Sequence, residues 1–214
     1  MQEVDNSLRH FVETEIIPRY AAFDKAHQTD HAATVIANSL AIAAHYPQVS
    51  VNVVYATAAY HDLGLSEGRE RHHIVSGEIV LHDERLRRWF TEEEIHLMKE
   101  AVEDHRASST HAPRTIYGRI VAEADRVIDP NVTLRRAVQY GLSHYPELGK
   151  EAQFDRLCAH MQEKYAEQGY LKLWIPESPN AERLQALRRI IANRQELRAC
   201  FERIYGEELI RMPG

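Results

Sequence analysis

The chain has 214 residues, of which 44% are hydrophobic and 27% are charged. This composition is that of a globular protein with enough apolar side chains for a core, and it excludes a disordered or fibrous chain. Because 32 Asp and Glu outnumber 26 Lys and Arg, the formal net charge is -6, which excludes a dedicated DNA-coating protein but is compatible with a small phosphorylated ligand.

Apolar residues recur at helical spacing along nearly the whole chain, and the alternation typical of strands is missing. The pattern therefore predicts an all-α fold. In chain order, the first predicted helices cover residues 8–16, 30–46, 51–62, 73–86, 92–106 and 116–128. Pro18 is expected to end the first helix, and Gly64 is expected to end the third in a left-handed conformation.

Three further amphipathic helices are predicted over residues 133–144, 147–166 and 181–205. Between them, residues 169–176 are apolar and aromatic and are bounded by Gly169 and Pro176, which is typical of an extended segment that packs on the helical core. We expect residues 1–130 to form that core and residues 131–214 to form a C-terminal helical extension packed on it.

The sequence also bears on the compartment. Its first 18 residues are charged and periodic, without the apolar region and cleavage site of a signal peptide. The longest uncharged apolar stretch, residues 49–60, is too short and too polar to span a bilayer. Cys158 and Cys200 lack a metal-type spacing and are expected to be small packing residues. These features predict a cytoplasmic protein that does not enter a membrane.

Histidine is the anomaly of this sequence, with 13 in 214 residues and no His run. We asked which ionisable residues share a predicted helix face with apolar residues three or four positions away. The residues that do so are His31, His61, His105 and Asp125. A single inward histidine usually hydrogen-bonds only to a backbone carbonyl, so the argument depends on the whole set.

Two inward-facing acids, Asp62 and Asp125, need a cation or a hydrogen-bond donor, because a buried unpaired carboxylate is very costly. Two imidazoles and two carboxylates, from His31, His61, Asp62 and Asp125, suit a divalent ion such as Mn, Fe, Co, Ni, Zn or Mg. Adjacent helical residues point about 100° apart, so His61 and Asp62 reach one ion most easily at a helix end. The sequence therefore predicts a metal site at the end of the third helix.

These residues resemble the pattern of the HD superfamily of metal-dependent phosphohydrolases, which is an isolated His, an adjacent His-Asp pair and a distant Asp. The matching words are AHQTDHAATV with His31, AAYHDLG with His61 and Asp62, and AEADRVID with Asp125. The resemblance covers roughly residues 19–130. It implies an HD-domain-like helical core, these four residues as metal ligands, and hydrolysis of a phosphate ester or anhydride, often on a nucleotide.

Two further words look like the same family, RHHIVSGEIV with His73 and AVEDHRASSTHAP with His105. The resemblance implies that such histidines either bind a second metal or face the substrate phosphate. Because His73 follows His61 by only 12 residues, we expect one ion per chain and leave a second open. His73 and His105, with Asp62, are then the catalytic candidates, and His72 is expected to face solvent.

Other polar residues are weaker candidates. A second set of phosphate contacts consists of Arg19, Lys25, Arg106, Arg114 and Arg119. Glu67 and Glu70 follow the His-Asp pair and are candidate general bases, although each is as readily interpreted as a solvated loop acid.

No nucleophile elbow, P-loop or dinucleotide fingerprint occurs, which favours a water activated by a metal. We therefore expect a metal-dependent phosphohydrolase for a small phosphorylated substrate, without a membrane or nucleic-acid surface, and leave a homo-oligomer open. Two alternatives remain. One is a dinuclear-iron oxygenase with the ligands His31, His61, Asp62, His73, His105 and Asp125. The other is a catalytically inactive nucleotide-binding module.

Overall fold

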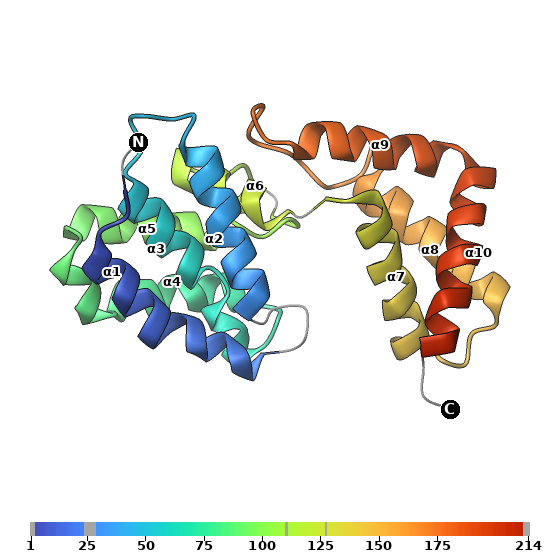
Figure 1. Cartoon of the computed structure of the whole chain (residues 1–214), viewed down its shortest axis with the longest axis horizontal. Helices are drawn as coiled ribbons and strands as arrows, with labels where there is room; N and C mark the ends of the chain where they lie inside the picture. Colours follow the sequence, from blue (N-terminus) through green and yellow to red (C-terminus); the bar gives the residue numbers. More distant parts are fainter. Residues whose placement is uncertain (1–2, 24–28, 110, 127, 212–214) are drawn as a thin grey trace. The chain divides into compact units, whose positions relative to one another are not determined.

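The computed structural model describes residues 3–23, 29–109, 111–126 and 128–211. Within these ranges every regular element is helical, which confirms the predicted all-α fold (Figure 1). The chain divides into two compact units. The first comprises residues 1–126 together with 173–178, and the second comprises residues 127–172 and 179–214.

The first unit contains six α-helices within the described ranges. They are α1 (Asn6–Phe11), α2 (Thr29–Ala43), α3 (Val51–Tyr60), α4 (His72–His82), α5 (Glu92–Glu103) and α6 (Ile116–Asp125). The predicted stop before Pro18 is wrong, since a π-helical turn (Val12–Ile16) leads into a 3-10 helix (Ile17–Ala22) that runs through this proline. Proline is tolerated there because the first turn of a helix needs no N–H at that position.

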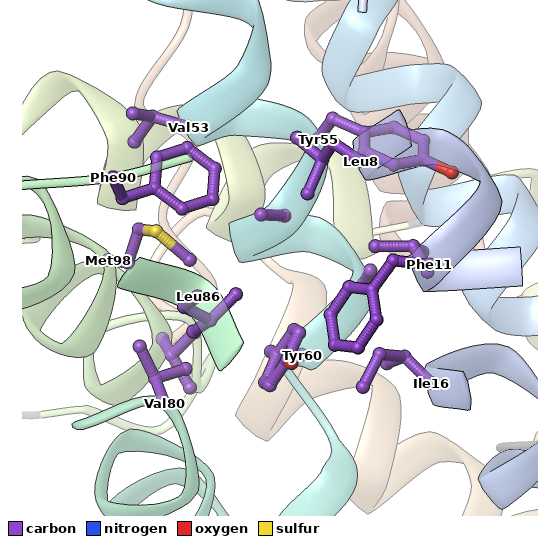
Figure 2. Close-up of a cluster of buried hydrophobic side chains, with 14 of the residues drawn as sticks. Leu8, Phe11, Ile16, Val53, Tyr55, Tyr60, Val80, Leu86, Phe90 and Met98 are labelled. Carbon is purple, nitrogen blue, oxygen red and sulfur yellow. The ribbon is translucent and has the colours of Figure 1, made fainter. Parts of the chain in front are cut away.

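Helix α3 is the central helix of the first unit. Its start is capped by Ser50, whose hydroxyl accepts the N–H of Val53. All residues from Val53 to Tyr60 are buried, and α2, α5 and α6 each contact this helix. Figure 2 shows one part of the core, where Tyr60 of α3 lies near Phe11 and Ile16 of the N-terminal segment. Each large apolar side chain buried in this way contributes ~1.5–3 kcal/mol, so the end of α3 is firmly held.

A close approach of α4 to the chain after α3 requires a glycine at position 64. A Cβ atom there would lie 2.2 Å from the carbonyl oxygen of His72 and 2.6 Å from the amide nitrogen of Ser76. The left-handed conformation predicted for Gly64 is wrong, because this residue belongs to a 3-10 helix (Leu63–Glu67). Among the described glycines, only Gly68 has a positive φ, of 97°. A glycine is needed at position 64 because it has no side chain, which leaves room for the backbone of α4.

The second unit contains α7 (Pro130–His144), α8 (Lys150–Tyr165), α9 (Asn180–Ala192) and α10 (Arg194–Arg211) (Figure 1). The single helix predicted over residues 181–205 is wrong, because the chain leaves helical geometry at Asn193 (φ -100°, ψ 96°). The side-chain oxygen of Asn193 accepts the N–H groups of Gln195 and Glu196 and so starts α10 as an N-cap.

The segment 173–178 packs on the first unit. Ile175 is 2% exposed and belongs to the same apolar cluster as Val54 of α3. The Trp174 amide donates to the Glu123 carboxylate over 2.8 Å. The broader expectation, that residues 131–214 form an extension packed on the core, stays a prediction. None of the helices in the described ranges combines the length and apolar character that crossing a bilayer requires.

Candidate metal centre

Six histidine and aspartate side chains from five helices meet in the first unit. They are His31 in the first turn of α2, His61 and Asp62 directly after α3, His72 at the start of α4, His105 just beyond α5, and Asp125 at the end of α6. All lie at or near helix ends.

The first group of side chains is formed by His31, His61 and Asp62, whose candidate ligand atoms all lie within 4.8 Å of one another. Nε2 of His61 lies 3.2 Å from Nε2 of His31 and 3.3 Å from Oδ2 of Asp62. Oδ1 of Asp125 lies 3.2 Å from Nε2 of His31. The four residues that the sequence singled out as ligands are thus brought together.

A second group shares the same aspartate. It comprises Asp62, His72 and His105, again with their candidate ligand atoms within 4.8 Å of one another. Oδ1 of Asp62 lies 3.3 Å from Nε2 of His105 and 3.4 Å from Nε2 of His72. The two carboxylate oxygens of Asp62 therefore face different pairs of histidines.

The expectation that His72 faces solvent is wrong, because its side chain is only 13% exposed and belongs to the second group. His73 lies outside both groups and instead lines a neighbouring cavity of about 420 Å³. The ring centroids of His72 and His73 are 5.5 Å apart. The sequence held no signal that separates the two histidines, because the buried Ser76 and Val80 of α4 follow His72 by four and eight residues and follow His73 by three and seven, and all of these are helical spacings.

Three of the histidines are oriented in the same way. Nδ1 lies 2.8 Å from the Ala58 carbonyl in His61, and 2.6 Å from the Val102 carbonyl in His105. In His72 it lies 2.8 Å from the carbonyl three residues earlier. Because a carbonyl can only accept, each Nδ1 carries a proton, which leaves Nε2 of the neutral ring as a lone pair aimed into the cluster. This is the tautomer that a metal needs.

The surroundings favour the ionised form of both carboxylates. Burial raises the pKa of Asp62, but the charge of His61 and hydrogen bonds from His105 and His31 outweigh it and hold that pKa far below its usual value. Burial likewise raises the pKa of Asp125, and the hydrogen bond from His31 and the charge of His61 reverse the effect. Two negative charges thus occupy one largely buried site.

The imidazoles respond in opposite directions. Burial lowers the pKa of His31, but hydrogen bonds to Asp125 and Asp62 raise it to about 9. Burial and the neighbouring charge of His105 lower the pKa of His72 to about 4. Without a metal, a proton on His31 therefore compensates part of the carboxylate charge.

This donor set fits a divalent cation. Its atoms are imidazole nitrogens and carboxylate oxygens, and no thiolate is among them, which suits borderline or hard ions rather than soft ones. A cation would also compensate the charges of the buried Asp62 and the partly exposed Asp125 directly. The donor types leave the identity of the ion open.

The weaker candidates that the structure describes belong to neither group of side chains, although Arg114 lines the cavity beside His73. Arg19, Arg119, Glu67 and Glu70 are exposed, and Lys25 lies outside the described residues. The guanidinium of Arg114 is bound to the carboxylates of Glu103 and Asp104, both of which line the cavity beside His73. Arg106 donates a 2.7 Å hydrogen bond to the carbonyl of Glu70 and so joins two loops.

Comparison with known proteins gives one family. The model of the HD domain matches residues 29–128, a range that includes every member of both groups. No curated protein and no solved structure matches the chain. Residues 29–128 therefore match an HD domain, which is consistent with the HD superfamily of metal-dependent phosphohydrolases.

Proposed function

We propose that this chain is a metal-dependent phosphohydrolase that acts on a small phosphorylated substrate, such as a nucleotide or a related phosphate ester or anhydride. The observation that carries the proposal is the placement of Asp62 within an HD domain, with one carboxylate oxygen toward each pair of histidines. A divalent ion bound there would lower the pKa of a coordinated water and polarise a phosphoryl oxygen.

The residues proposed to hold metal are His31, His61, Asp62 and Asp125. A second position is proposed at Asp62, His72 and His105, because their candidate ligand atoms lie within 4.8 Å of one another. The argument from sequence against a second ion rested on the spacing of 12 residues from His61 to His73. His72 is nearer still in sequence, but its Nε2 lies 3.4 Å from Oδ1 of Asp62, so the short spacing does not keep it from this carboxylate. If only one ion binds, His72 and His105 are left to contact the substrate phosphate.

The substrate is proposed to approach from the more open side of the cluster. The side chain of Asp125 is 25% exposed and that of His31 is 13% exposed, whereas His61 is fully buried. The cavity beside His73 has the size of a small-molecule site and lies next to His72. We assign it to the part of the substrate that is not cleaved, with His73 as a contact.

The dinuclear-iron oxygenase remains a second candidate, because a second group of donor atoms lies beside the first, with His72 in the place expected for His73. Hydrolysis works with ions that do not change oxidation state, whereas oxygenase chemistry needs two redox-active ions. The identity of the bound metal and the consumption of O₂ therefore separate the two functions.

The test is release of inorganic phosphate from a panel of nucleotides and sugar phosphates, with the metal-free protein loaded in turn with Mn, Co, Ni, Fe, Zn or Mg. Asp62→Ala should abolish release, and Asp155→Ala should not, because Asp155 is an exposed acid of the second unit. Metal binding without phosphate release, accompanied by O₂ consumption in the iron form, would replace the proposal by the oxygenase.

A further inference from the structure

Tyr20 is a fully buried residue that touches the metal centre from outside the matched HD domain. It lies on the 3-10 helix Ile17–Ala22, ahead of the matched residues 29–128. Its side chain is 0% exposed, and its ring centroid lies 6.2 Å from that of His61. The N-terminal segment therefore contacts His61 and Asp62, the residues at the end of α3 that belong to the candidate metal centre.

The hydroxyl of Tyr20 bridges the end of α3. It donates a 2.9 Å hydrogen bond to the carbonyl of Ala59 and accepts a 3.3 Å hydrogen bond from the N–H of Asp62. The last turn of a helix leaves its carbonyls without intrahelical donors, and a side chain can take their place. The chain turns out of helical geometry at Asp62, where φ is -112° and ψ is 7°.

This bridge acts at the one residue that both groups share. A change in the orientation of the Asp62 peptide would move its carboxylate, and so would alter the distances to His61 and to His105 together. On the basis of the proposed metal-dependent function, we propose that Tyr20 is a positioning residue that fixes the His61–Asp62 turn and thereby sets the affinity of both groups for metal.

The role assigned to Tyr20 lies in its hydroxyl group. The ring also packs against Phe23, with centroids 5.4 Å apart, so that Tyr20→Phe keeps this packing and removes only the two hydrogen bonds. The chain offers a matched control. Tyr60 is also 0% exposed, and its hydroxyl donates to Asp83 over 2.7 Å rather than to the turn.

The experiment is a titration of the metal-free full chain with Co²⁺ and, separately, Mn²⁺. Loss of a residue that orients a metal ligand typically weakens metal binding about 10–100-fold, and we expect this for Tyr20→Phe. Tyr60→Phe should retain the affinity of the wild type. In the metal-free protein, hydrogen exchange at the Asp62 amide should become faster in Tyr20→Phe and should stay unchanged in Tyr60→Phe.

Wild-type metal affinity in Tyr20→Phe would overturn this inference. So would an equal loss of affinity in Tyr60→Phe, since a general loss of stability would then explain both variants. Failure of the proposed function gives a different result, in which the wild type binds Co²⁺ without releasing phosphate from any substrate and the contrast between the two variants persists.

Discussion

The Nε2 atoms of His72 and His105 lie 3.2 Å apart, and both face the same carboxylate oxygen of Asp62. In each ring the Nδ1 proton is directed at a backbone carbonyl, so the neutral rings would bring two lone pairs together. Two lone pairs at this distance repel each other unless a proton or a cation lies between them. The second group is therefore arranged to receive a positive charge.

Replacement of His72 should affect metal binding, and replacement of His73 should not. His72→Ala removes a donor atom of the second group, so we expect less metal per chain or weaker binding. His73→Ala should retain the metal content of the wild type and raise KM, because His73 lines only the neighbouring cavity. Elemental analysis of the purified variants measures the metal content. Loss of metal in His73→Ala alone would mean that His73, and not His72, is the metal ligand.

Gly64→Ala should destabilise the protein. Its Cβ would collide with the backbone of His72 and Ser76, neither of which can give way without a shift of α4. Overpacking of this kind costs about 1–3 kcal/mol in the free energy of unfolding. Urea denaturation followed by circular dichroism measures it.

The matched control for Gly64→Ala is Gly206→Ala. Gly206 lies within α10, and its added Cβ would meet no atom within 4 Å. Since alanine favours the helix, this variant should be more stable by about 0.5–1 kcal/mol. If both variants were equally stable, the close approach of α4 would not be the reason for a glycine at position 64.

Asp83 predicts a pH-dependent contribution to stability. Burial raises its pKa, but hydrogen bonds from Arg85 and Tyr60 outweigh this effect and keep the pKa below its usual value. A lowered pKa in the folded state means that the contribution is complete above about pH 4 and is lost as the pH falls through the folded-state value. Asp83→Asn should therefore reduce the free energy of unfolding by about 1–3 kcal/mol at pH 7.

The same variant supplies the check on this reasoning. The difference in unfolding free energy between Asp83→Asn and the wild type should become smaller between pH 7 and pH 2, because the carboxylate of the unfolded chain takes up its proton below about pH 4, before that of the folded protein does. Urea denaturation at the two pH values measures the difference. A constant difference would mean that ionisation of Asp83 contributes nothing to stability.

Much of the fold follows from the sequence, because helical periodicity is repeated over many residues. The approximate bounds of α2, α3, α5 and α6 could be predicted in this way, and inward-facing polar residues on their apolar faces marked His31, His61 and Asp125. The break at Asn193 could not be predicted from periodicity, because the apolar pattern continues through it. Only the side-chain cap of α10 reveals it.

The parts of the site that the sequence did not reveal depend on distant contacts. His72 and His73 are adjacent, and the packing of α4 decides which one turns inward. Gly64 matters because α4 passes close to it, and Tyr20 because its hydroxyl reaches Asp62 from 42 residues away. Such contacts leave no periodic pattern in the chain.

The most direct test of the account is the metal content per chain of protein purified without a chelator, compared between the wild type, Asp62→Ala and the control Asp155→Ala. Because Asp62 contributes to both groups, we predict bound divalent metal in the wild type and the control, and its loss in Asp62→Ala with the helical circular dichroism signal retained. Full metal occupancy in a folded Asp62→Ala protein would contradict the assignment of this site.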